Sequence, residues 1–297
     1  MKDIWNDRSW SPMLLGEIDK PFDSDEYFYE VKFDGIRTIA FVSPSSVKLY
    51  SRRNIEITFL YPELQKLCKL VKRNTIFDGE IVLMENGVPS FSALQKRVHL
   101  KRKDKINYQA SINPVVFVCF DLLYDNEDLT NYSLSERKKV LNNFDDSDVF
   151  IKTKYIEREG VHLFKNVKHL NLEGIVAKKK DSIYEISTRT DNWLKIKNLQ
   201  EGNFYIGGYV DKPENFVISV LLGEYINKKL NYVGKATLGK KTSLYKKIKK
   251  QKELLKNPFV NFDNNKVTYI KPEQTCKVKY LERTLNNQLR QPVIKNK

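Results

Sequence analysis

The feature that most constrains the fold is a change of pattern near residue 200. Before it, short apolar strand signals alternate with helix signals, and after it strand signals dominate. The strand signals of the first part are SVKLYS, TIFDGEIVLM, NPVVFVCFDLLY, EGIVAKKK and NWLKIKN. At about 150 residues per domain, a chain of 297 residues has room for two. We therefore predict one domain over residues 1–199 and a second over residues 200–297.

Helix signals in the first part have recognisable ends and faces. Ser133 stands three residues before Glu136, which is the spacing of a capping box. In REGVHLFKNVKHLNL, apolar residues recur at helical intervals at Val161, Phe164 and Val167. Mixed with the strands, these helices predict an α+β or α/β domain with much antiparallel pairing.

The second part reads as strands joined by turns. Its strand signals are FYIGGYV, FVISVLLGEYI, KLNYVGKAT and TCKVKYLERT, and one basic helix signal, TSLYKKIKKQKELLK at residues 242–256, follows the third strand. Several strands and one helix in under a hundred residues predict a small all-β barrel of the OB-fold type.

Net charge, hydropathy and cysteine content indicate which partners, location and stabilising groups to expect. Lys and Arg number 52 and Asp and Glu 37, so the net charge is +15, which favours a polyanionic partner such as nucleic acid. No apolar run approaches about 18 residues, and the first residues lack a signal peptide, so we expect a cytoplasmic protein that does not enter membranes. Three widely spaced cysteines predict neither disulfides nor structural zinc.

One stretch, YEVKFDGIRTIAF, places a lysine between two strand signals. Asp34-Gly35 is a turn pair, so strand, turn and strand predict a hairpin-like unit with Lys32 at its mouth. A lysine nucleophile needs its free amine, and neighbouring cations or a metal must then lower its pKa from about 10.4.

Further along the chain, carboxylates and lysines stand at other strand ends. Asp78 and Glu80 lie in FDGEIV, Glu173 precedes a strand, and Lys195 and Lys197 alternate on one strand face. Each is ordinary when taken singly, since such residues are mostly solvated turns and surfaces. Their order and spacing are what point to a common site.

In this order the motifs resemble those of ATP-dependent DNA ligases, members of the covalent nucleotidyltransferase superfamily. The matching stretches are EVKFDGIR, YSRRN, FDGEIV, VCFDLLY, LEGIVAKKKDSIY and WLKIK. GVPSFSALQKR and YSLSERKKVL further resemble the ligase module of bacterial end-joining and prophage ligases. The resemblance covers residues 11–294 and implies a nucleotidyltransferase domain of packed antiparallel sheets with flanking helices, followed by an OB-fold.

The resemblance also implies roles for individual residues. Lys32 would attack the α-phosphate of ATP, and Asp34 would orient groups around the DNA nick. The other roles are adenine recognition by Glu30, base stacking by Phe120, ribose contact by Glu80, nucleotide or 5′-phosphate binding by Arg37 and Arg52, phosphate contact by Arg189, α-phosphate contact by Lys195 and Lys197, and metal binding by Glu173 with Glu80. The implied cofactors are ATP and Mg²⁺, with Mn²⁺ as an alternative, and the implied partner is nicked duplex DNA, bound by a monomer.

Both ends of the chain bear on this assignment. Only 31 residues precede Lys32, which favours ATP over NAD as the nucleotide donor. LRQPVIKNK resembles the start of the last family motif, with Arg290 and Lys295 matching its basic residues. The following Gly-x-Arg of relatives is missing, so we expect slow lysine adenylation or replacement of that arginine by Lys295 and Lys297.

Two alternatives remain open. An RNA ligase or an mRNA-capping guanylyltransferase shares the lysine motif, although EVKFDGIR together with FDGEIV and PSFSALQKR favours a DNA ligase. A nucleic-acid-binding protein with a decayed catalytic half would bind nicked DNA without ever becoming labelled by ATP.

Overall fold

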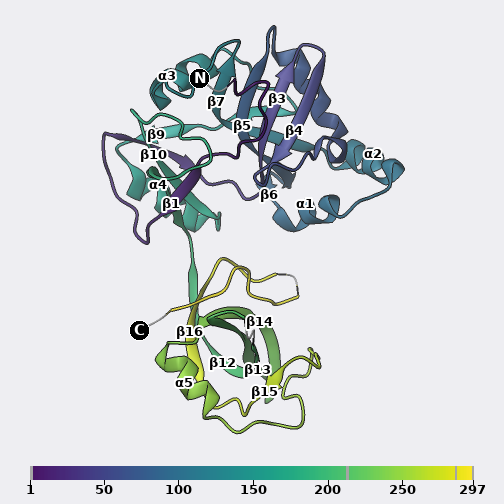
Figure 1. The fold of residues 1–297 in the computed structure, drawn as a ribbon, viewed down its shortest axis with the longest axis vertical. Helices are drawn as coiled ribbons and strands as arrows, with labels where there is room; N and C mark the ends of the chain where they lie inside the picture. The colour runs from purple at the N-terminus through teal and green to yellow at the C-terminus, as the bar shows by residue number, and fades with distance from the viewer. Residues whose placement is uncertain (1–2, 212–213, 285, 296–297) are drawn as a thin grey trace. The chain divides into compact units, whose positions relative to one another are not determined.

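The computed structural model describes residues 3–211, 214–284 and 286–295. The chain divides into two compact units, Met1–Asn198 and Leu199–Lys297 (Figure 1). Each unit has its own hydrophobic core. Among the described residues, no helix is both long and apolar enough to span a bilayer.

The first unit contains two sheets, of which the first has the strand order β1-β11-β10-β2-β9. Its strands are β1 (Leu14–Glu17), β2 (Tyr27–Val31), β9 (Tyr155–Glu157), β10 (Gly174–Lys179) and β11 (Arg189–Lys197). All neighbouring strands are antiparallel except β1 and β11, which run parallel. Helix α4 (Gly160–His169) packs on this first sheet.

The second sheet has the order β4-β3-β5-β7-β8, with β6 paired to β5. Its strands are β3 (Ile36–Ser43), β4 (Ser46–Ser51), β5 (Thr75–Glu85), β6 (Val88–Pro89), β7 (Val115–Asp125) and β8 (Phe150–Lys152). The remaining helices of the unit are η1 (Thr58–Leu60), η2 (Pro62–Leu70), α1 (Phe91–Val98), α2 (Lys103–Ile112) and α3 (Leu134–Leu141). The capping box predicted for α3 is confirmed, because Ser133 and Glu136 exchange both hydrogen bonds.

Alternation along the strands decides which side chains lie between the sheets. Phe28 and Trp193 of the first sheet share one buried cluster with Phe41 and Ile76 of the second. Their strand neighbours point away: Tyr29 packs with α4, for example. Successive side chains of a strand leave opposite faces, so residues an even number of positions from these four also face the space between the sheets.

The hairpin-like unit predicted around Lys32 is wrong, although both of its strands exist. β2 pairs with β9 and β10, whereas β3 pairs with β4 and β5, so the two strands belong to different sheets. The short link between them crosses from one sheet to the other. Gly35 permits the crossing, because a Cβ there would lie 2.2 Å from the carbonyl oxygen of Ile81.

The second unit is a curved sheet with the order β14-β13-β12-β16-β17, with β15 paired to β12 (Figure 1). Its elements are β12 (Gln200–Asp211), β13 (Val217–Ile226), β14 (Lys229–Gly239), α5 (Ser243–Lys249), β15 (Thr268–Tyr269), β16 (Thr275–Tyr280) and β17 (Val293–Ile294). The concave core includes Phe204, Val220 and Val278.

The predicted helix over residues 242–256 is too long, because α5 ends at Lys249. The chain beyond it pairs with the segment around β15: Leu254 N donates to Tyr269 O at 2.9 Å, and Lys271 N donates to Lys252 O at 3.0 Å. Tertiary backbone pairing thus overrides the helical pattern of the lysine-rich sequence.

Candidate active site

The predicted site residues of the first sheet lie in rows across its strands. Glu30 on β2 is directly opposite Val176 on β10, and Val176 is directly opposite Lys195 on β11. The next row consists of Phe28, Lys178 and Trp193. Directly opposed residues have side chains on the same face of a sheet. Since Phe28 and Trp193 belong to the core between the sheets, both rows face the second sheet.

Lys32 lies just beyond the end of β2, in the link to the second sheet. Its backbone N donates to Gly174 O at 2.9 Å, which holds it beside the start of β10. Its Nζ lies 2.7 Å from Oε2 of Glu173, a carboxylate that is only 5% exposed. The structure therefore brings the predicted nucleophile and a predicted metal ligand into direct contact, with Asp34 two residues further along the same link.

Lys195 and Lys197 share one carboxylate, that of Glu17 at the end of β1. Lys195 Nζ is 3.0 Å from Oε2, and Lys197 Nζ is 3.9 Å from Oε1. Lys197 is also opposite Gly174, the residue that accepts from Lys32 N. The three predicted catalytic lysines are thus collected at one end of the first sheet.

Glu30 is buried among two lysines. Its Oε2 accepts from Lys178 Nζ at 2.8 Å and from Thr153 Oγ1 at 3.0 Å, and its Oε1 forms an ion pair with Lys138 Nζ at 2.5 Å. Burial alone would raise the pKa of Glu30, but the two ammonium groups outweigh it and hold the pKa below its usual range. Burial lowers the pKa of Lys178 to about 8 against the opposing pull of Glu30.

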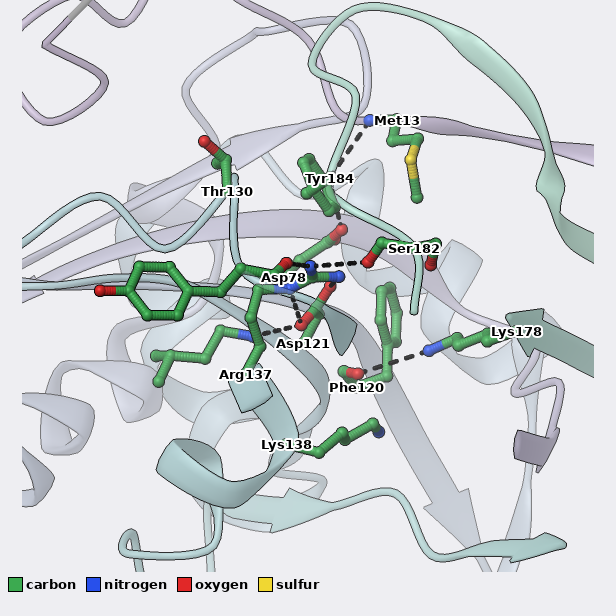
Figure 2. Close-up of polar contacts among 12 residues, drawn as sticks. Met13, Asp78, Phe120, Asp121, Thr130, Arg137, Lys138, Lys178, Ser182 and Tyr184 are labelled. Carbon is green, nitrogen blue, oxygen red and sulfur yellow. Dashed lines mark hydrogen bonds and ion pairs between the residues drawn. The ribbon is translucent and has the colours of Figure 1, made fainter. Parts of the chain in front are cut away.

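The ring of Phe120 has two cations near it. Lys178 Nζ is 4.3 Å from the ring centroid and Arg37 Cζ is 5.2 Å from it, both within the range of cation–π attraction. Trp193 meets the same ring edge-on. Figure 2 shows Lys178 reaching toward Phe120, whose carbonyl oxygen accepts from Lys178 Nζ at 3.4 Å. If adenine stacks on the Phe120 ring, it therefore either displaces one of these two cations from the ring or binds beside it.

Arg37 is anchored on the second sheet by a carboxylate that is completely buried. Its Nε and Nη2 donate to Asp78 at 3.1 and 2.6 Å. Tyr184 donates to the same carboxylate at 2.6 Å (Figure 2). Burial opposes the charge of Arg37, but Asp78 outweighs it and raises the pKa of the guanidinium. Tyr184 also accepts from Met13 N at 3.2 Å, so the N-terminal segment helps to fix this cation.

This geometry agrees with what sequence comparison finds. Residues 12–197 match the family model described as ATP dependent DNA ligase domain, and residues 214–297 match the ATP dependent DNA ligase C terminal region. The chain belongs to the ATP-dependent DNA ligase family. The predicted nucleotidyltransferase domain followed by an OB-fold, and the use of ATP by the enzyme, are thereby confirmed.

Relatives of this ligase include viral-derived and end-joining proteins. The SPbeta prophage-derived DNA ligase-like protein LigB of Bacillus subtilis is 38% identical over 213 residues, which cover 70% of this chain and 75% of LigB. The multifunctional non-homologous end joining protein LigD of Mycolicibacterium smegmatis is 30% identical over 98% of this chain. The chain spans only 39% of that LigD.

Solved structures give the same assignment. Mycobacterial DNA ligase D complexed with ATP and MES superposes with a TM-score of 0.61 at 26% identity, over 98% of this chain and 95% of that one. A Lig E DNA ligase shares the fold with a TM-score of 0.64 at 18% identity, over 96% of this chain and 98% of that one.

Other predicted site residues of this ligase lie outside the cluster that Lys32, Glu173, Lys195 and Lys197 form at one end of the first sheet. Arg52 is exposed in the turn after β4, and no ion pair links it to the cluster within the described ranges. Arg189 is exposed at the start of β11 and donates to Leu15 O. In the second unit, Arg290 pairs with Glu282 and Lys295 with Glu201, both at 3.0 Å, while Lys297 lies outside the described residues.

Several residues that touch the site were missed from the sequence. Alternation could have indicated Lys178, because it lies two positions from Val176 in the quoted strand. Lys138 and Tyr184 lie in stretches that carry the family resemblance, YSLSERKKVL and LEGIVAKKKDSIY, but no role was predicted for either. Thr153 and Glu17 had no local signal, because each reaches the site from a distant part of the chain.

Two carboxylates, Glu80 and Glu173, are predicted to bind a metal, and the part of the chain that the structure describes contains no group of three or more possible metal-binding side chains. Burial raises the pKa of Glu80 to about 8; Lys32 and Arg37 lower it, and the carboxylates of Glu173 and Asp78 raise it further. The charged form of Glu80 is thus poorly compensated, which is what a divalent cation would correct. Mg²⁺ in proteins commonly uses one or two carboxylates and completes its shell with phosphate oxygens and water.

This raised pKa makes stability depend on pH. Between pH 5 and 8 the Glu80 carboxyl has already lost its proton in the unfolded chain but largely keeps it in the folded one, so this residue makes the protein less stable as pH rises. Glu80→Gln removes this effect. The melting temperature of Glu80→Gln minus that of wild type should therefore increase from pH 5 to pH 8. In a unit of this size, each kcal/mol of stability changes the melting temperature by about 2–4 °C.

Melting curves at pH 5, 6.5 and 8 provide the measurement. Glu157→Gln is the control, because that carboxylate is half exposed at the edge strand β9. If the difference in melting temperature between Glu80→Gln and wild type is the same at all three pH values, the pKa of Glu80 is not raised in the folded protein.

Proposed function

We propose that this chain seals nicks in duplex DNA, and that Lys32 is its nucleophile. In the first step Lys32 Nζ gives up a proton and its electron pair attacks the α-phosphorus of ATP. A phosphorus–nitrogen bond forms, the bond to the bridging oxygen breaks, and pyrophosphate leaves. The observation that carries this proposal is the gathering of Lys32, Lys195 and Lys197 at one end of the first sheet, in a chain of the ligase family.

Charge neutralisation is the main demand of such a reaction. Phosphoryl transfer depends on positioning and electrostatics more than on acid–base groups. Lys195 and Lys197 would meet the negative charge that develops at the α-phosphate, since they occupy the end of β11 nearest Lys32. Before attack, Lys32 must also leave its 2.7 Å contact with Glu173.

We assign Glu173 and Glu80 to a metal site on the grounds of their charge and position. When bound there, Mg²⁺ or Mn²⁺ would neutralise phosphate charge. Glu80 would also contact the ribose, and Glu30 and Phe120 would bind the adenine. Because Glu30 is held by Lys138 and Lys178, it would present a fixed, charged carboxylate to the base.

In the second step AMP passes to the 5′-phosphate at the nick, and in the third the 3′-hydroxyl displaces AMP and joins the strand. Asp34, Arg37, Arg52 and Arg189 are proposed to serve these steps. The net charge of +15 supports backbone binding, which should weaken steeply with salt because bound counterions are released. We propose residues 1–199 as the adenylyltransferase domain, residues 200–297 as the OB-fold domain, and a cytoplasmic monomer without structural zinc.

The test is label transfer in two stages. The protein is first treated with pyrophosphate, which reverses adenylation and removes any AMP already bound, and is then freed of pyrophosphate. It is next incubated with Mg²⁺ and ATP labelled on the α-phosphate. Label that becomes protein-bound and is released on adding nicked DNA, together with a sealed strand, supports the proposal. Labelling by GTP rather than ATP, or sealing of nicked RNA only, would overturn it, and so would protein that is never labelled.

A further inference from the structure

The first strand of the chain, β1, carries an acid that the ligase motifs do not include. Glu17 ends β1, and its register places it directly opposite Lys195 of β11. Residues directly opposite one another have side chains on one face, so Glu17 joins the row of Lys195, Val176 and Glu30. It therefore belongs to the face that looks toward the second sheet.

This position depends on an irregularity in the strand pairing. Leu15 is opposite Thr190, but the next residue, Gly16, is opposite Leu194. An unbroken register would have put Glu17 opposite Asn192, three residues and about 10 Å from Lys195. Gly16 makes the shift possible, because a Cβ there would lie 2.5 Å from Asp191 Oδ1 and 3.0 Å from a methyl group of Leu194.

Backbone contacts hold the strand end in the shifted register. Ile18 N donates to Lys195 O at 3.2 Å, directly after Glu17, and the Arg189 side chain donates to Leu15 O, directly before the irregularity. The chain therefore fixes the backbone on both sides of Glu17. The side chain itself is 47% exposed, while those of Lys195 and Lys197 are 20% and 19% exposed.

The carboxylate acts on both lysines together. One oxygen is 3.0 Å from Lys195 Nζ and the other is 3.9 Å from Lys197 Nζ. The two carboxylate oxygens of Glu17 thus contact the two ammonium groups in the way that two non-bridging oxygens of a phosphate would. Resting on the proposed function, we propose that Glu17 is a positioning residue for lysine adenylation, which holds Lys195 and Lys197 ready before ATP arrives and releases them to the α-phosphate.

Two opposite effects follow from this role. The carboxylate competes with the triphosphate for the same cations, so its removal strengthens nucleotide binding. It also orders two flexible side chains, so its removal slows the chemical step, because that ordering must then occur during the reaction. A residue with only a structural role would not separate the two quantities in this way.

The experiment compares wild type with Glu17→Gln, Glu17→Asp and Glu157→Gln. The control acid, Glu157, is also about half exposed and pairs with a lysine, Lys180, at the far edge of the same sheet. Single-turnover labelling over a range of ATP concentrations gives the maximal rate of lysine adenylation. Equilibrium titration with α,β-methylene-ATP, whose α–β linkage cannot be cleaved in this way, gives nucleotide affinity separately, and melting curves report folding.

For Glu17→Gln we expect affinity for the analogue to rise about threefold, as for a partly exposed ion pair, and the maximal rate to fall about tenfold. Glu17→Asp should lie between Glu17→Gln and wild type, and Glu157→Gln should match wild type. Unchanged rate and affinity in Glu17→Gln would overturn the inference, and so would parallel losses of both with a lower melting temperature. If wild type is never labelled, the proposed function fails and this inference with it; a labelled wild type beside an unaffected Glu17→Gln rejects the inference alone.

Discussion

Lys32→Ala is expected to lose all transfer of AMP from ATP to the protein. The side chain supplies the atom that would form the bond to phosphorus, and removal of a covalent nucleophile costs on the order of 10⁶-fold in rate. Lys195 and Lys197 are not expected to replace it, because their proposed role is to remain charged and contact the oxygens of the α-phosphate. Protein-bound label from ATP marked on the α-phosphate is the measurement.

Two companion variants make this result specific. Lys32→Arg keeps the positive charge but stays protonated, so it should also remain unlabelled. Lys48→Ala, an exposed lysine on the edge strand β4, should label like wild type. Lys32→Ala should still seal a nick that already carries AMP on its 5′-phosphate, because that step needs no new lysine adduct. Label on Lys32→Ala at the wild-type level would mean that another residue is the nucleophile.

Arg137→Ala is expected to have the largest effect on stability. Arg137 on α3 and Asp121 on β7 are both fully buried and form a two-bond ion pair at 2.9 and 2.8 Å (Figure 2). The third nitrogen of the guanidinium donates to Tyr132 O and Ser182 O at 2.6 and 3.1 Å. Alanine would leave a buried carboxylate without its cation, which typically costs about 3–5 kcal/mol.

Denaturant unfolding followed on the first unit measures this loss. Arg102→Ala is the matched control, since its ion pair with Asp104 is exposed on both sides and such pairs contribute about 0–1 kcal/mol. A double variant, Arg137→Met with Asp121→Asn, has no unpaired buried charge. It should therefore be much more stable than Arg137→Ala and recover a large part of the lost stability. A loss for Arg137→Ala no larger than that for Arg102→Ala would show that the buried pair is not needed.

Arg137 also shows why a stability effect would reach the active site. Its carbonyl partner Ser182 follows β10, and Ser182 Oγ accepts from Trp193 Nε1 at 3.2 Å. The next residue but one, Tyr184, donates to the carboxylate that anchors Arg37. The buried pair thus helps to position the segment between β10 and β11. These two strands carry Lys178, Lys195 and Lys197 of the proposed site.

The sequence predicted the strands around the site well, because strands buried on one or both faces leave apolar runs or alternation. Each strand signal of the first part corresponds to a strand of the structure, for example TIFDGEIVLM to β5. The six motifs identified the family that the comparisons confirm. The two errors, the hairpin at Lys32 and the long basic helix, both concern which segments pair, and local pattern does not specify a distant pairing partner.

What the sequence determined by itself was the set of chemical groups: a lysine beside an acid, two alternate lysines on one strand, and a surplus of positive charge. These depend on residue type and short spacing, which the chain carries directly. Only the tertiary structure decided their companions, such as Glu17 beside Lys195 and Lys138 beside Glu30, separated by 178 and 108 positions along the chain. The reason is physical: ion pairs in a folded site form between strands and helices that meet only after the sheets assemble, so their partners have no fixed spacing in sequence.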